Sequence, residues 1–143
     1  MIRTGPAGYP EGSRSPADAV RKVRAAGLSA LEIQFVRNVL YNPVRAQEAR
    51  SEAQEDGVLL SVHAPYFINL NAGDEEWPKS RKRLMDAAYY GFLAGATDII
   101  FHPGSYFGGT PEEVLPAVLP RLAGCARELE QTGIKVVLRP ETM

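Results

Sequence analysis

Two histidines and one glutamate recur at a constant interval along this chain. His102 follows His63 by 39 positions (102 − 63), and Glu141 follows His102 by 39 positions (141 − 102). Imidazole and carboxylate groups together form a ligand set that suits Zn²⁺, with Mn²⁺ or Fe²⁺ less well suited. A lone histidine at the end of a strand is more often an ordinary polar residue than a ligand. The equal spacing is therefore what raises the metal-site hypothesis.

Each of the three residues follows an apolar run rich in β-branched residues, which is typical of a buried strand. The predicted strands cover residues 30–35, 58–62, 98–101 and 134–138, with a weaker candidate near residues 2–4. His63 comes directly after one run and His102 directly after the next, and Glu141 lies just beyond the last. The chemistry of the chain is thus expected at strand ends.

Helices are predicted between these runs, because a capping side chain followed by proline opens most of the intervening segments. Such pairs stand at residues 15–16, 42–43 and 110–111, and a further helix is predicted after Trp77 and Pro78. Strands and helices therefore alternate, which predicts an α/β fold with a parallel sheet and right-handed crossovers. From this pattern alone, a closed barrel and an open doubly wound sheet both fit.

In either fold the carboxyl ends of the strands meet at one edge, which is where parallel α/β proteins bind ligands. A proline lies beside or within two residues of each of the three candidate ligands, and it ends the hydrogen-bond ladder there. These are Pro65, Pro103 and Pro140. The three side chains are therefore expected to face a shared cavity.

Four short motifs lie around these strand ends, in a fixed order that spans most of the chain. They are Val-His-Ala-Pro-Tyr-Phe-Ile-Asn-Leu at 62–70, Lys-Ser-Arg at 79–81, Phe-His-Pro-Gly-Ser-Tyr at 101–106 and Pro-Glu-Thr at 140–142. In sequence and spacing they resemble the endonuclease IV family of apurinic/apyrimidinic endonucleases. The resemblance implies a (β/α)8 TIM barrel that carries three zinc ions and hydrolyses the phosphodiester 5′ to an abasic site in duplex DNA.

A complete barrel of eight units typically needs about 250 residues. The 143 residues present are therefore expected to be the N-terminal part of a TIM barrel, with about its first five strands and four helices, in a single domain over residues 1–143.

The resemblance also implies roles for individual residues. His63 and His102 would ligate the first zinc ion, and Glu141 would bridge it to a second and take part in catalysis. Tyr66 and Phe67 match the family's loop that enters the minor groove at the abasic nucleotide; the alternative is that they only pack the rim of the barrel. Lys79 and Arg81 stand in the first turn of a helix. They are candidate DNA-phosphate contacts, or simply part of a solvated face.

Composition limits the classes of partner. The formal net charge is −1 and the sequence pI is about 6.1, so no global positive charge indicates nucleic-acid binding, and any DNA contact would be local. The single cysteine, Cys125, excludes an internal disulfide framework and favours a reducing compartment, so a cytoplasmic location is expected. The sequence shows neither a signal-peptide pattern nor a membrane-spanning apolar run.

Two other functions remain open at this stage. A sugar isomerase or epimerase on the same barrel would use one divalent metal to polarise a keto-sugar, since a single fold hosts many reactions. Alternatively, the chain could be a catalytically incomplete barrel that covers its open sheet edges by self-association.

Overall fold

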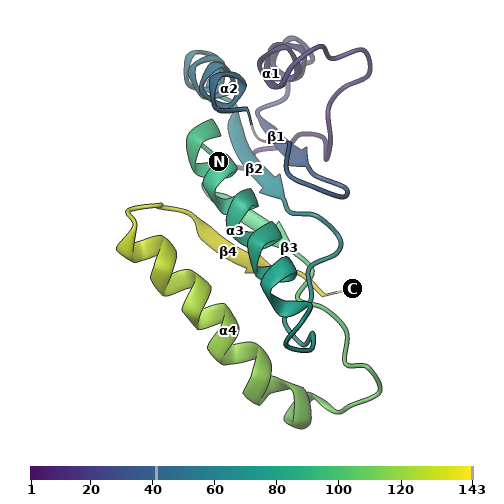
Figure 1. The fold of residues 1–143 in the computed structure, drawn as a ribbon. Helices are drawn as coiled ribbons and strands as arrows, with labels where there is room; N and C mark the ends of the chain where they lie inside the picture. Colours follow the sequence, from purple (N-terminus) through teal and green to yellow (C-terminus); the bar gives the residue numbers. More distant parts are fainter. Residues whose placement is uncertain (41, 143) are drawn as a thin grey trace.

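A computed structural model describes residues 1–40 and 42–142 of the chain. Four parallel strands form one sheet in the order in which they occur in the sequence: β1 (Ala30–Gln34), β2 (Leu59–His63), β3 (Asp98–Phe101) and β4 (Val137–Pro140). Figure 1 shows the strands side by side, with a helix leading from each to the next. This consecutive order is that of a barrel wall, and the structure is a partial TIM barrel.

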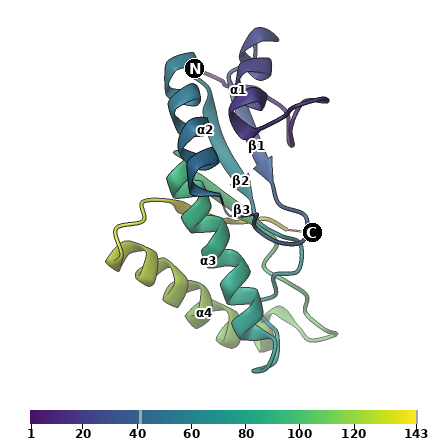
Figure 2. The ribbon, with the colours of Figure 1, turned by 45° about the horizontal axis from the view of Figure 1, so that its top comes forward.

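Four helices accompany the strands: α1 (Pro16–Ala25), α2 (Pro43–Asp56), α3 (Trp77–Ala94) and α4 (Pro111–Gln131). The predicted caps are confirmed, because the side chains of Ser15, Asn42 and Thr110 each accept a backbone N–H of the first turn. Figure 2 shows α2 and α3 in front of the sheet. Within the part of the chain that the structure describes, no helix is both long and apolar enough to cross a bilayer.

The core lies between the sheet and the helices. Alternate residues of the strands, such as Ile33, Val62 and Phe101, are fully buried on this side. Helix α3 packs closely on β2 and β3 at Gly91, where a Cβ atom would stand 2.5 Å from the Cδ1 of Ile99. The opposite side of the strands, which would line the inside of a barrel, is more open.

Two of the five predicted strands need correction. Residues 2–4 do not form a strand: the segment only runs beside β1, with an isolated bridge between Ala7 and Glu32. Glu32 donates its N–H to the carbonyl of Pro6, but Pro6 has no N–H to donate, so the ladder is interrupted. The structure therefore has four strands where the sequence predicted about five.

The last strand is also displaced from its predicted range of 134–138. Its ladder begins at Val137, whose N–H donates to Thr97, because Ile134 instead donates to Leu129 and closes the end of α4. The strand consequently extends to Pro140 and ends directly before Glu141.

The strand register brings the carboxyl ends to one edge. Ile100 is the partner of His63 across β2 and β3, and Phe101 is the partner of Pro140 across β3 and β4. His102 follows Phe101 and Glu141 follows Pro140, so both come directly after the second of these pairs. The sheet thus presents all three candidate ligands on the same rim.

Candidate metal centre

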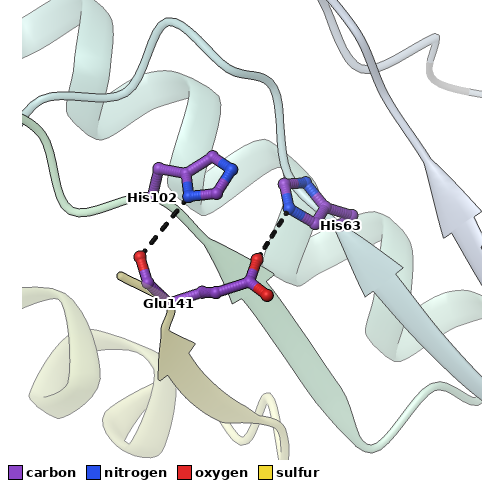
Figure 3. A group of neighbouring side chains, drawn as sticks. All are labelled: His63, His102 and Glu141. Carbon is purple, nitrogen blue, oxygen red and sulfur yellow. Dashed lines mark hydrogen bonds and ion pairs between the residues drawn. The ribbon is translucent and has the colours of Figure 1, made fainter. Parts of the chain in front are cut away.

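His63, His102 and Glu141 come together at the rim, as the sequence predicted. One ligand atom of each lies within 4.8 Å of the others, and among the described residues they are the only such group of three or more histidine, cysteine, aspartate or glutamate side chains. Figure 3 shows the two imidazoles and the carboxylate facing one another from the ends of β2, β3 and β4. The structure thus brings the three side chains together, and their role as metal ligands stays a prediction.

His63 is the most enclosed of the three. It ends the central strand β2 and is only 7% exposed. Its Nδ1 lies 2.9 Å from the carbonyl oxygen of Ala64, which can only accept, so Nδ1 carries the proton. This contact leaves Nε2 to face Glu141, and metal-bound histidines commonly donate their other ring N–H to a carbonyl in the same way.

Glu141 lies opposite that nitrogen. Its Oε2 is 3.4 Å from Nε2 of His63, although the carboxylate is 54% exposed. Two acceptor atoms at this distance repel each other unless a proton or a metal ion lies between them. The pair is thus arranged around a position for a cation.

His102 completes the group from β3. Its Nδ1 lies 3.4 Å from the backbone carbonyl oxygen of Glu141, and its ring centroid is 5.1 Å from that of His63. The backbone N–H of Glu141 donates to the carbonyl of Phe101, which fixes the glutamate beside the strand that carries His102. The hydrogen bonds between β3 and β4 therefore hold Glu141 close to His102.

The spacing suits a metal ion of the Zn²⁺ type. Zn–N and Zn–O bonds of about 2.0–2.1 Å place tetrahedral ligand atoms roughly 3.3 Å apart. The 3.4 Å between His63 and Glu141 matches this value, and the 4.8 Å limit for the whole group leaves a small side-chain rotation for His102. The residues present can hold a divalent metal with nitrogen and oxygen ligands.

Tyr66 and Phe67 stand on the loop after β2, next to the triad. The Tyr66 ring is stacked on His102 with 6.0 Å between centroids and 17° between planes, and it lies 5.6 Å from the ring of His63. Tyr66 is half exposed and Phe67 is 61% exposed. Tyr66 therefore packs on the ligands, whereas Phe67 faces solvent; a role of either in DNA binding stays a prediction.

Lys79 and Arg81 are not brought to the triad by any contact. Lys79 pairs with Glu76 at 2.6 Å within the first turn of its own helix, and Arg81 pairs with Glu128 on α4. Both charges are compensated within the chain, so DNA would have to compete with these carboxylates.

The sequence analysis missed Arg121, which organises the loop that carries the aromatic pair. Its Nη1 donates to the carbonyls of Leu70 and Ala72 at 2.7 and 2.6 Å, and its guanidinium lies 4.9 Å from the ring centroid of Trp77. An arginine inside an amphipathic helix carries no signal of such a contact. It was therefore not detectable from one sequence.

The xylose isomerase-like TIM barrel family matches the chain over residues 20–143. The chain belongs to this family. Within it, the chain is 35% identical to Endonuclease 4 of Thermus thermophilus over 121 residues, which are 79% of this chain and 44% of that protein. It is also 31% identical over 143 residues to the uncharacterized protein MJ0133 of Methanocaldococcus jannaschii, covering 99% of this chain and 51% of that protein. The chain thus spans about half the length of these relatives.

Solved structures agree with this assignment. An endonuclease IV from Thermus thermophilus superimposes with a TM-score of 0.68 at 30% identity, over 87% of this chain and 48% of that one. An L-ribulose 3-epimerase superimposes with a TM-score of 0.74, over 98% and 49%, but at 12% identity, which shows the fold alone. The endonuclease IV is thus a homologue, whereas the epimerase shares the barrel.

Proposed function

We propose that this chain belongs to a metal-dependent endonuclease that hydrolyses the phosphodiester 5′ to abasic sites in duplex DNA, with Zn²⁺ as the metal. The observation that carries the proposal is the placement of His63 Nε2 opposite Glu141 Oε2 at 3.4 Å, beside His102. The homology to Endonuclease 4 of Thermus thermophilus supports the nuclease over other barrel reactions. A cytoplasmic location stays a prediction of the sequence.

Each of the three candidate ligands has a separate role in this proposal. His63 and His102 would hold the metal through their imidazole nitrogens, and Glu141 would add a carboxylate that is exposed enough to reach a second ion. A divalent metal bound by these residues would activate water near neutral pH and would offset the charge of the phosphate oxygens. Glu141 is the candidate catalytic residue, because its carboxylate borders both the ligand position and solvent.

Tyr66 supports the same proposal, because it is stacked on a ligand and half exposed at the rim. An aromatic ring in this position can lie against the sugar of a nucleotide that lacks its base. Phe67, next in sequence, is exposed on the same loop. Lys79 and Arg81 would contact DNA phosphates only after breaking their ion pairs with Glu76 and Glu128.

The test is nicking of a labelled duplex that contains one tetrahydrofuran abasic analogue, in the presence of Zn²⁺. We expect a single cut 5′ to the analogue that a chelator abolishes, that returns with added zinc, and that is lost in His63→Ala. The undamaged duplex is the substrate control, and Gln34→Ala, at the neighbouring strand end, is the protein control. The proposal is wrong if zinc-loaded wild type leaves the duplex intact or cuts it equally with the chelator.

A sugar epimerase is the second candidate, because Lys79 and Arg81 are already paired and the net charge is −1. Incubation of the zinc- or manganese-loaded chain with ketopentoses and ketohexoses, followed by chromatography of the sugars, distinguishes the two. A C3 epimer formed without any nicking would favour this alternative. If neither reaction occurs, the third hypothesis of an incomplete barrel that self-associates is tested by its sedimentation.

A further inference from the structure

A groove of about 460 Å³ opens beside the metal centre, between the loop at 66–76 and the loop at 103–109. Aromatic rings stand along it, and polar side chains close its other sides. Its lining includes Tyr66, Phe67, Asn69, Arg83, Ser105 and Phe107. Sequence reasoning assigned no role to most of these residues.

The two loops that wall the groove are bound to each other. Leu70 donates its N–H to the carbonyl of Pro103 at 2.8 Å, and the Asn71 side chain donates to the carbonyl of Ser105 at 3.0 Å. Gly104 has no room for a side chain, because a Cβ there would lie 2.0 Å from Oδ1 of Asn69, and its φ is +121°. Contacts between the two loops therefore define the shape of the groove.

Phe107, which lines the groove, has an unusual backbone conformation. Its φ is 51°, and it is the only residue other than glycine with positive φ among the described residues. A bulky side chain in the left-handed region is strained, and strain of this kind concentrates at ligand sites. Phe107 is 72% exposed, so burial of its side chain does not compensate for the backbone strain. The backbone is held in place by the N–H of Phe107, which donates to Oγ of Ser105 at 3.2 Å.

The groove adjoins the candidate metal centre, and its lining contains one cation, Arg83, and one carboxylate, Glu76, which is paired with Lys79. Tyr66 lines it and at the same time stacks on His102. Arg83 lines it as well and donates to the backbone carbonyl of Phe67 at 3.0 Å, which holds its guanidinium close to the loop that carries Tyr66 and Phe67. Exposed aromatic side chains and an arginine in the same lining suit a nucleobase that stacks, with its phosphate near the cation.

We propose that this groove binds the nucleobase of the nucleotide adjacent to the phosphodiester held at the triad, with the base against Phe107. The proposal rests on the proposed function, because the phosphate at the triad fixes which nucleotide reaches the groove. The proposed contact is made to a neighbouring nucleotide that keeps its base. Recognition of the abasic position alone does not require such a contact.

The test uses small phosphodiester probes, so that binding is measured apart from cleavage. Thymidine joined through a phosphodiester to a tetrahydrofuran sugar, with the thymine on either the 5′ or the 3′ side, is compared with two tetrahydrofuran sugars joined in the same way. Dissociation constants are measured by NMR titration of the zinc-loaded full chain. Stacking of one base on an aromatic side chain predicts that one thymine-bearing probe binds about tenfold more tightly than the base-free probe.

Variants assign that preference to the groove. Phe107→Leu keeps an apolar side chain and should bind both probes equally, whereas Phe107→Trp should keep the preference. Tyr106→Leu is the matched control, since Tyr106 is the neighbouring exposed aromatic residue and does not line the groove; it should behave as wild type. Equal affinities in wild type, or an unchanged preference in Phe107→Leu, would overturn the proposal.

The two proposals fail separately. A duplex that is nicked at its abasic site by a protein without base preference means that the subsite is wrong and the endonuclease stands. A base preference that depends on Phe107, in a protein that does not nick, means that the groove binds a base and the endonuclease proposal fails.

Discussion

The two sides of the candidate metal centre are held in very different ways. His63 ends a central strand, with β1 and β3 paired on either side, and is 7% exposed. Glu141 follows the edge strand β4, most of whose residues are exposed, and its carboxylate is 54% exposed. The difference teaches that the histidine side is set by the core, whereas the carboxylate side depends on a few contacts at the edge of the sheet.

Those edge contacts can be named. The guanidinium of Arg139 on β4 lies 2.6 Å from Asp98 on β3, and the N–H of Glu141 donates to Phe101. On the side of β2, Arg121 of α4 donates hydrogen bonds to the loop that carries Tyr66 and Phe67. The following predictions test how much each side of the centre relies on its supports.

The largest effect is expected from the same truncation made in the two strands. Leu60 of β2 is 2% exposed, so Leu60→Ala should lower the free energy of unfolding by about 2–5 kcal/mol. Leu138 of β4 is only partly buried, and Leu138→Ala should cost about 1 kcal/mol. Urea unfolding of both variants measures the difference. Equal losses would contradict the contrast between the core side and the edge side.

An intermediate effect is expected at Arg121. Arg121→Met should keep most of the apolar contact but leave the carbonyls of Leu70 and Ala72 without their charged donor, a loss of about 1.5–3 kcal/mol. Arg127→Met, at an exposed arginine on the same helix, is the matched control and should change little. Thermal unfolding gives the stability, and limited proteolysis reports the loop. If the loop at 66–76 is cut no faster than in wild type, Arg121 does not restrain it.

The smallest effect is expected at the link between β3 and β4. The hydrogen bond from Thr97, together with the Arg139 guanidinium, holds the pKa of Asp98 below its usual range. Asp98→Asn should cost about 0.2–1 kcal/mol near neutral pH, because the ion pair is partly exposed.

The pH dependence of this link has a definite sign. Because folding lowers the pKa of Asp98, its ionised form stabilises the protein above the ordinary carboxyl pKa, and that stability is lost as the pH falls through the lowered value. Wild type and Asp98→Asn should therefore converge in stability under acid conditions. A gap that stays constant from neutral to acid pH would show that Asp98 acts through shape and not through charge.

The convergence of the three candidate ligands could be predicted from the sequence because their positions depend on a simple rule. Parallel strands put their carboxyl ends at one edge, so His63, His102 and Glu141 had to converge once the alternation of strands and helices was recognised. The limits of the strands were less predictable. Ile134 is apolar enough to suggest a strand, but it closes α4, and only its N–H partner Leu129 reveals this.

The groove lies beyond single-sequence reasoning for a physical reason. Glycines at 104, 108 and 109 indicate a tight turn, but they do not show that Phe107 takes a positive φ or that the turn packs on Asn69. Arg83 was visible only as part of a basic helix start. These roles depend on contacts between loops that are about 35 residues apart in sequence, which periodicity and capping signals do not carry.

The most direct test of the account is the zinc content of the purified chain after dialysis, measured by elemental analysis for wild type and four variants. We expect zinc in wild type and in the control Gln34→Ala, and its loss in His63→Ala and His102→Ala. Glu141→Gln should retain less zinc than wild type but more than the histidine variants, because its carboxylate is the exposed ligand. A wild type without zinc in zinc-containing buffer, or histidine variants that keep the full amount, would contradict the metal centre and the function built on it.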